Sequence, residues 1–211
     1  MRTLIAITAT LVGVLATGAG AATLDTLTIT ANPAVVVYGK TTTISGTLSP
    51  AKANQTVTIQ SQMCGKPSFT KEASVKTTAT GAFTATVTPT VNTTYQAKQK
   101  ATASSSVVVK VKPLVQLAKV ARGSFTAKVT AGQALTGKVV LFQRYSKLKK
   151  RWVQVKKVTL TTATPATPKP ATVSSAAFKA KVALGARLRL LLSTVQAAPC
   201  YISATSNVVR A

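Results

Sequence analysis

Residues 81–97 read Gly81-Ala-Phe-Thr-Ala-Thr-Val-Thr-Pro-Thr-Val-Asn-Thr-Thr-Tyr-Gln-Ala97. Apolar residues alternate with threonines from Phe83 to Val87, Pro89 interrupts them, and the alternation resumes at Tyr95. Strict alternation gives a strand one apolar face and one polar face, as in an antiparallel sheet that covers a core on one side. The stretch therefore predicts two antiparallel β-strands joined by a short turn.

The same pattern returns in residues 177–192, where Phe178 matches Phe83, Val182 matches Val87 and Leu190 matches Tyr95. Further inward positions match in pairs of strands: Ile44, Gly46 and Leu48 with Phe125, Ala127 and Val129; Val57 and Ile59 with Val139 and Leu141; Phe69 and Val75 with Trp152 and Val158. The chain is therefore predicted to use one β unit twice.

Residues 1–22 are predicted to form a secretory signal peptide. A positive start at Met1-Arg2 precedes an apolar run over residues 4–14 and small residues at 19–21, so we expect cleavage after Ala21 or Ala22. The apolar run is too short for a membrane span, and no second run of spanning length follows. We expect a mature protein that is secreted, either free outside the cell or associated with its envelope.

The rest of the chain has the profile of an all-β protein. Turn residues recur at short intervals, and no segment sustains the apolar stripe of a helix, so helix content is expected to be close to nil. The strand count predicts two seven-stranded immunoglobulin-like β-sandwiches in tandem, residues 23–112 and 113–211. A proline-rich insertion at 164–171 is expected to be a loop of the second sandwich.

Several short pieces carry a family resemblance: Val37-Tyr-Gly39, Val57-Thr-Ile-Gln60, Gly81-Ala-Phe83, Thr90-Val-Asn-Thr-Thr-Tyr95 and Ser206-Asn-Val-Val-Arg210. In these pieces the chain resembles the tandem bacterial immunoglobulin-like (fibronectin type III-like) repeats of exported proteins from high-GC Gram-positive bacteria. The resemblance covers nearly all of the mature chain and implies an extracellular β-sandwich module without catalytic residues. The second copy departs from it by lacking a tyrosine at the position of Tyr95.

The inventory of reactive side chains argues against an enzyme. Histidine is absent, and the only acidic residues are Asp25 and Glu72. That stock cannot assemble a catalytic triad, a pair of carboxylates for glycoside hydrolysis, or an ordinary zinc or calcium site. We therefore expect neither a catalytic site nor a cofactor or metal.

The two cysteines, Cys64 and Cys200, predict one disulfide bond in an exported protein. Cys64 lies in the turn after the third strand of the first copy, and Cys200 lies in the turn before the seventh strand of the second. Because strands alternate in direction, both turns should lie at the junction between the domains. An interdomain disulfide is the favoured interpretation, and an intermolecular bond or two free thiols remain open.

Two aromatic residues are assigned structural roles. Tyr95 begins the sixth strand, where a tyrosine corner is found in such folds, with its hydroxyl bonded to the backbone a few residues upstream. Trp152 is expected to be a core residue at the position that matches Phe69. The odd spacing through Lys156-Lys157 predicts a bulge there and leaves the direction of Trp152 open.

The strongest functional hint is the formal charge of +25, from 27 Lys and Arg residues against two acids. Nine lysines and both acids lie in residues 23–112, whereas seventeen Lys and Arg residues lie in 113–211, so the copies carry about +7 and +17. The densest run predicts a polyanion-binding site of Arg144, Lys147, Lys149, Lys150 and Arg151. Strand direction places the hairpin that contains them at the end of the molecule far from the first copy.

These charges predict electrostatic adhesion of a monomeric module to anionic cell-wall polymers or another polyanion. The alternative is a passive spacer or accessory subunit with an unknown protein partner, whose lysines keep an exposed sandwich soluble and discourage pairing of strand edges. Nucleic acid is disfavoured as a ligand because only Tyr145 and Trp152 stand beside the basic run, which therefore lacks a stacking platform.

Overall fold

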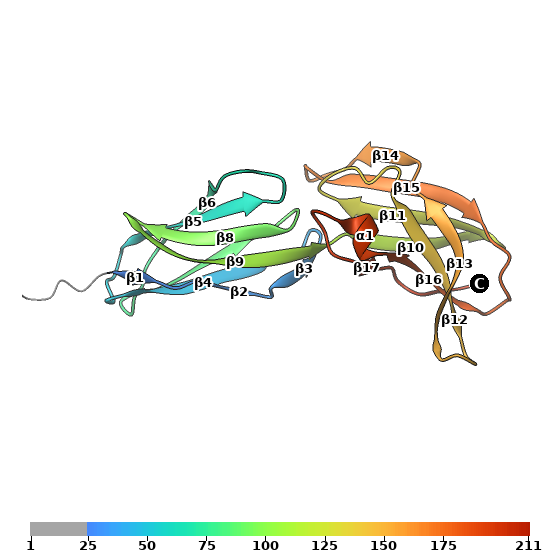
Figure 1. The fold of residues 1–211 in the computed structure, drawn as a ribbon, viewed down its shortest axis with the longest axis horizontal. Helices are drawn as coiled ribbons and strands as arrows, with labels where there is room; N and C mark the ends of the chain where they lie inside the picture. Colours follow the sequence, from blue (N-terminus) through green and yellow to red (C-terminus); the bar gives the residue numbers. More distant parts are fainter. Residues whose placement is uncertain (1–24) are drawn as a thin grey trace, which may run out of the picture.

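The computed structural model describes residues 25–211. The predicted signal peptide, residues 1–22, lies outside the described residues. Strands dominate the described part of the chain, and its one helix is α1, the four residues Thr194–Ala197. The strands form four sheets, which Figure 1 shows as two face-to-face pairs arranged one after the other along the long axis.

The first sheet pair takes all of its strands from residues 26–112. One sheet has four strands, in which β4 lies between β1 and β2 and also pairs with β7; the other has five strands in the order β3-β9-β8-β5-β6. The strands are β1 (Thr26–Leu27), β2 (Thr30–Asn32), β3 (Val35–Val37), β4 (Thr42–Ser49), β5 (Thr56–Met63), β6 (Thr70–Lys76), β7 (Ala82–Val87), β8 (Thr93–Gln99) and β9 (Thr102–Lys112).

The second sheet pair takes its strands from residues 114–210. Its four-stranded sheet has the order β10-β11-β15-β14, and its five-stranded sheet has the order β13-β12-β16-β17 with β18 also paired to β16. The strands are β10 (Leu114–Ala121), β11 (Ser124–Ala131), β12 (Val139–Ser146), β13 (Arg151–Thr159), β14 (Thr162–Pro165), β15 (Thr172–Lys179), β16 (Arg187–Leu192), β17 (Ala204–Thr205) and β18 (Val209–Arg210).

Two prolines mark irregular places in the sheets. Pro33 lies between β2 and β3, where the chain passes from one sheet to the other. Proline has no N–H to donate to a ladder, so it suits a crossing point. The proline-rich insertion is only partly a loop, because its first residues, up to Pro165, belong to β14, which pairs with β15.

The register of β12 is one residue away from the predicted register. Val140 and Phe142 are fully buried, whereas Val139 and Leu141, the residues expected to point inward, are only half-buried. A shift of one residue along a strand moves every side chain to the opposite face. Phe142 packs in the core with Phe125 and Phe178, with ring centroids 5.0–5.7 Å apart.

The two sheet pairs share a local irregularity that fixes their true correspondence. The ladder between β5 and β6 shifts between Ile59 and Gln60, and the ladder between β12 and β13 shifts between Phe142 and Gln143. These shifts mark β-bulges, in which one strand carries an extra residue. Ile59 therefore corresponds to Phe142, and the repeated unit includes its bulge.

The same ladders correct the match made for Tyr95. Tyr95 lies opposite Ser61 on β5, and Leu188 lies opposite Arg144 on β12. Ser61 and Arg144 each stand two residues beyond the matched Ile59 and Phe142. The counterpart of Tyr95 is therefore Leu188 and not Leu190.

A disulfide bond joins Cys64 to Cys200 across the two sheet pairs, with their Cα atoms 5.3 Å apart. Cys64 directly follows β5, and Cys200 lies between α1 and β17. The predicted pairing is therefore present. It connects two turns that strand direction brings to the same junction.

Hydrogen bonds around Asn92 reinforce this junction. The Asn92 N–H donates to the carbonyl of Cys200 at 2.9 Å, and the Asn92 carbonyl accepts from the Cys64 N–H at 2.9 Å. The Asn92 side-chain oxygen accepts from the N–H of Val111 at 2.8 Å. One residue of the first sheet pair thus contacts both cysteine segments and the last strand before the second pair.

Tyr201 closes the other side of the junction. Its side chain is buried, and its hydroxyl accepts a hydrogen bond from the Gly132 N–H at 2.9 Å. Burial raises the pKa of Tyr201 to about 12. Gly132 packs so closely on the first sheet pair that a Cβ there would lie 2.9 Å from the Thr90 carbonyl oxygen. The two sheet pairs therefore meet in a close contact as well as through the disulfide.

Candidate anion-binding site

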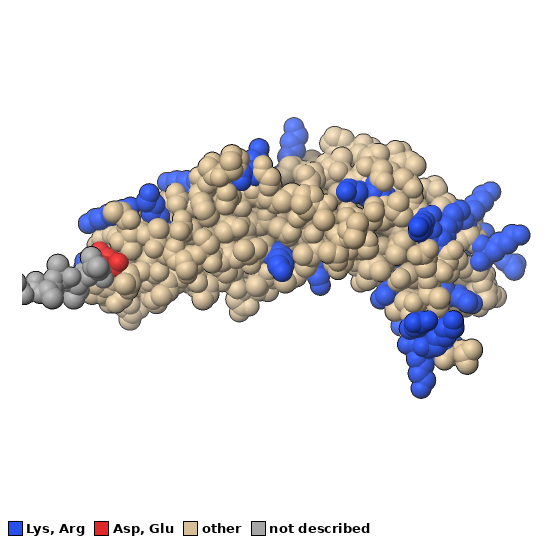
Figure 2. Space-filling model, in the orientation of Figure 1, with Lys and Arg blue, Asp and Glu red and all other residues tan. Residues whose placement is uncertain are grey.

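The hairpin between β12 and β13 carries the basic residues that the sequence analysis singled out. Arg144, Lys147, Lys149, Lys150 and Arg151 are all exposed on it. The hairpin lies at the end of the molecule far from β1, as strand direction predicts (Figure 1). Figure 2 shows Lys and Arg side chains gathered on this hairpin and over the adjacent end of the second sheet pair.

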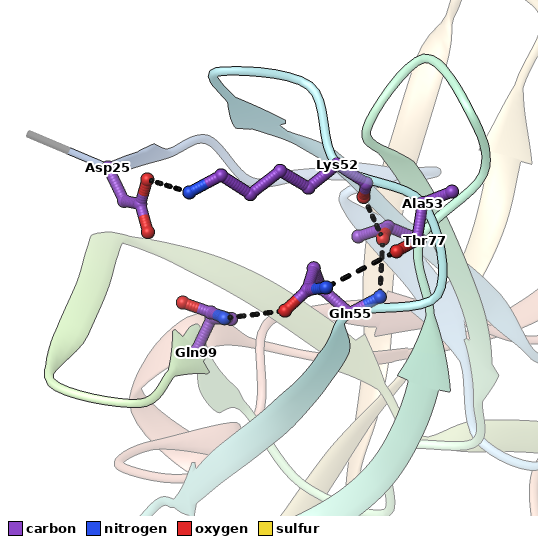
Figure 3. A network of polar contacts seen from close by, with 6 residues as sticks. All are labelled: Asp25, Lys52, Ala53, Gln55, Thr77 and Gln99. Carbon is purple, nitrogen blue, oxygen red and sulfur yellow. Dashed lines mark hydrogen bonds and ion pairs between the residues drawn. The ribbon is translucent and has the colours of Figure 1, made fainter. Parts of the chain in front are cut away.

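The acidic residues lie in the first sheet pair and already have polar partners. Figure 3 shows a network at its outer end, made by Asp25, Lys52, Ala53, Gln55, Thr77 and Gln99. Lys52 Nζ donates to Asp25 at 3.1 Å, which is the only ion pair within residues 25–211. Glu72 accepts a hydrogen bond from the Ser61 hydroxyl at 2.8 Å. Since residues 113–211 contain no acid, the cations of the second sheet pair have no counter-ion within it.

An aromatic pair stands at the base of the hairpin. Tyr145 on β12 lies directly opposite Trp152 on β13, and their rings are 5.5 Å apart at 68° between planes. Both side chains are half-buried, on the outer face of the sheet. The expectation that Trp152 is a core residue is therefore wrong. The predicted bulge does occur, opposite the Phe142–Gln143 step, and it sets which residues of β13 point outward.

Two arginines of β16 lie against these aromatic rings. The Arg189 guanidinium carbon is 4.3 Å from the centre of the Trp152 ring, and that of Arg187 is 5.2 Å from the centre of the Tyr145 ring. Cations are attracted to the negative face of an aromatic ring at such distances. The aromatic pair therefore holds two guanidinium groups side by side on the outer face.

Arg189 is held by a further contact. Its Nε donates to the side-chain oxygen of Gln143 at 2.9 Å, and Gln143 lies opposite Arg189 in the ladder between β12 and β16. Burial lowers the pKa of Arg189, but an arginine starts so far above neutrality that it remains a cation. With Nε engaged, the outer N–H groups of the guanidinium are left to meet a ligand.

Arg187 and Arg189 were missed as site residues in the sequence analysis. Their alternation with Leu188 and Leu190 predicts that both point away from the core. Their contacts with Tyr145 and Trp152 could not be predicted, because they depend on the pairing of β16 with β12 and of β12 with β13.

Tyr95, the predicted tyrosine corner, lies away from this site in the core of the first sheet pair. Its side chain is buried, and this burial together with the nearby charge of Glu72 raises the pKa of its phenol. A side-chain hydrogen bond with Thr93 acts in the opposite direction. The hydroxyl-to-backbone bond expected of a corner stays a prediction, whereas Tyr201 makes such a bond at the junction.

Within residues 25–211 no helix is both long and apolar enough to cross a membrane. The same part of the chain contains no cluster of three or more His, Cys, Asp or Glu side chains that would suit a metal ion.

No protein-family model matches the chain, and no curated protein matches it. Among solved structures, the chain has a distant likeness to a tetra-tandem repeat in the extending region of a large adhesion protein. The two are 12% identical with a TM-score of 0.37, and the match covers 89% of this chain and 49% of that one. The chain thus spans about half the length of that structure, and a likeness of this degree transfers no function to it.

Proposed function

We propose that the protein is an exported, monomeric and non-enzymatic module of the cell envelope, built as two immunoglobulin-like β-sandwiches over residues 23–112 and 113–211. The second sandwich would adhere to anionic surface polymers. The observation that carries this proposal is the imbalance of charge: seventeen Lys and Arg residues and no acid lie in 113–211. Four of these cations, Lys147, Lys149, Lys150 and Arg151, are exposed on one protruding hairpin.

A concentrated set of exposed cations attracts polyanions over a distance limited by salt. The screening length is about 10 Å at 0.1 M salt and shortens as salt rises. Adhesion of this kind is therefore strong at low ionic strength and falls steeply as salt is added. Phosphate-rich and uronic wall polymers have the required charge.

A passive spacer or accessory subunit is the second candidate, and the junction favours it. The Cys64–Cys200 bond and the hydrogen bonds of Asn92 resist bending between the two sheet pairs. A stiff rod of this kind holds an attached partner at a fixed distance from a surface. In this candidate the lysines maintain solubility and protect strand edges.

Retention of the mature protein on anionic particles over a NaCl series tests the first candidate. The test variant replaces Lys147, Lys149, Lys150 and Arg151 by Gln. The matched control replaces four exposed lysines of the first sheet pair, Lys40, Lys71, Lys98 and Lys110, by Gln. Both variants lose the same charge, so any difference between them reports on its position.

The proposal expects the hairpin variant to lose at least about tenfold in retention and to show a flatter salt dependence, because close contacts are lost. The control variant should lose less. Equal losses would mean that net charge alone governs retention. Unchanged retention of the hairpin variant would contradict the proposal and favour the spacer.

A further inference from the structure

We propose that Arg187 and Arg189, held by Tyr145 and Trp152, form a site that recognises the oxyanions of an acidic linear glycan. The oxyanion is a sugar carboxylate or a sugar phosphodiester, which share the acceptor geometry that a guanidinium fits. This inference deepens the proposed function and rests on it. It separates a site with defined geometry from the general attraction of the hairpin lysines.

The arginine pair carries an unbalanced positive charge. Arg187 and Arg189 occupy alternate residues of β16, so both project from the outer face, with Cα atoms about 7 Å apart. Neither has an acidic partner among residues 25–211, where the single ion pair is in the other sheet pair. Two like charges held side by side repel, and a bound anion would relieve that repulsion.

The two guanidinium groups are preorganised for binding. A free arginine loses rotamer freedom when it binds, and this loss weakens binding. Here Arg189 is already confined by the Trp152 ring at 4.3 Å and by Gln143 at 2.9 Å. Arg187 lies 5.2 Å from the Tyr145 ring and 6.0 Å from the Trp152 ring. The hairpin lysines have no such supports, so they attract an anion without orienting it.

The surface of the site suits an acidic glycan better than a nucleic acid. Single-stranded nucleic acid binds proteins largely by stacking its bases on free aromatic faces. The face of Trp152 that a base would use is occupied by Arg189, and Tyr145 meets Trp152 edge-on. What remains available is the N–H edge of the guanidinium groups on an open sheet face. Acidic groups of a glycan suit that surface better than bases do.

The position of the site suits binding in two steps, first attraction to the hairpin and then binding to the arginine pair. The Tyr145–Trp152 pair is followed directly by the Ser146–Arg151 pair that opens the hairpin. A polymer drawn to the hairpin by charge therefore arrives beside the arginine pair. The exposed lysines would set the rate of encounter, and the arginines would set how long the polymer stays.

The test uses the full disulfide-bonded mature chain and a charge-conserving double variant, Arg187→Lys/Arg189→Lys. Lysine keeps the charge but lacks the planar fork and stacks less well on aromatic rings. The matched control is Arg122→Lys, because Arg122 is exposed and has no aromatic or hydrogen-bonded partner among the described residues. Trp152 is the only tryptophan of the chain, so its fluorescence reports directly on this site.

The probes are polygalacturonate for carboxylates, phosphomannan for sugar phosphodiesters, dextran as a neutral glycan and oligo-dT as a nucleic acid. Titrations are run at about 0.3 M NaCl, where exposed charges are largely screened. We expect a saturable change in fluorescence with one or both acidic glycans and none with dextran. The double variant should bind about tenfold more weakly, and Arg122→Lys should bind within twofold of the parent protein.

Which acidic glycan responds identifies the oxyanion. Equal affinity of the double variant, or an equal response to oligo-dT, would overturn the arginine site. If the parent protein is retained on anionic particles but its fluorescence never changes, the hairpin adheres without this site, and only the further inference fails. If the parent protein is not retained at all, the proposed function fails with it.

Discussion

The outer faces of the two five-stranded sheets differ although their scaffolds agree. Both sheets bulge at matched places, Ile59–Gln60 in the first and Phe142–Gln143 in the second. The matched outer positions of the central strands hold Gln60, Gln62, Thr94 and Gln96 in the first sheet and Gln143, Tyr145, Arg187 and Arg189 in the second. These four matched positions are thus all neutral in the first copy, whereas two of them are arginines in the second.

The outer side chains of the two sheets also make different hydrogen bonds. In the first sheet, Gln62 Nε2 donates to the carbonyls of Lys66 and Pro67 at 3.2 and 3.0 Å, across the turn that contains Cys64. In the second sheet, Gln143 accepts from Arg189. The first face supports the turn that bears the disulfide, and the second face holds its arginines toward solvent. Inner residues determine the scaffold, and outer residues determine what each copy does with it.

Uncoupling the two copies should have the largest effect. Replacing Cys64 and Cys200 together by Ser removes a link across 136 residues, and the chain-entropy model predicts a loss of about 5 kcal/mol in the free energy of unfolding. Denaturant unfolding of the variant beside the parent protein measures this loss. A loss below about 1 kcal/mol would show that each copy unfolds independently of the link.

Truncating matched inner positions should have the next largest effect. Phe142→Ala is expected to cost about 4 kcal/mol and Ile59→Ala about 3 kcal/mol, because both side chains are fully buried and leave a cavity. The outward Leu141→Ala, measured by the same denaturant unfolding, should cost about 1 kcal/mol or less. A larger cost for Leu141 than for Phe142 would mean that β12 has the register expected from the sequence and that Phe142 is not the counterpart of Ile59.

The protein should lose stability at high pH because Tyr201 at the junction ionises. Burial raises the pKa of Tyr201 to about 12 in the folded protein, above its ordinary value of 10.0. Its stabilisation is therefore fully present below pH 10 and is lost as pH rises through about 12, by about 2 kcal/mol. Urea unfolding measured from pH 9 to pH 12 follows this loss. The pKa of Tyr95 in the first copy is also raised, so both tyrosines contribute to the loss of stability at high pH.

Tyr201→Phe separates the two tyrosines. It should reduce the loss above pH 10 and cost about 1–2 kcal/mol at neutral pH, because the Gly132 N–H then lacks its acceptor. An unchanged pH profile in this variant would assign the whole effect to the first copy.

Exchanging the outer residues should have the smallest effect on stability. Arg187→Thr with Arg189→Gln gives the second copy the residues found at Thr94 and Gln96 of the first. We expect the free energy of unfolding to change by less than about 1 kcal/mol, since only outer-face contacts are lost. Glycan affinity, measured by Trp152 fluorescence, should fall strongly. A large loss of stability would show that the arginines serve the fold.

Features that depend on local pattern and on residue composition could be predicted from the sequence. The alternation of apolar and polar residues around Phe83 predicted strands, because successive side chains of a strand point to opposite faces of the sheet. Strand direction alone located the turns of Cys64 and Cys200 at one junction. Because residues 113–211 contain no acidic residue, the net charge of the second copy is positive whatever contacts its side chains make.

Contacts between residues far apart in the chain could not be predicted in this way. The direction of Trp152 depends on the residue at which β13 bulges, because one extra residue changes which alternate residues face inward on one side of the bulge relative to the other. The neighbours of Arg187 and Arg189 depend on which strands pair, and Gln143 lies 46 residues from Arg189 in the chain. Pairing and register minimise the free energy of the whole sheet, so no local stretch records them. The lysine hairpin could therefore be predicted from the sequence, and the arginine site beside it could not.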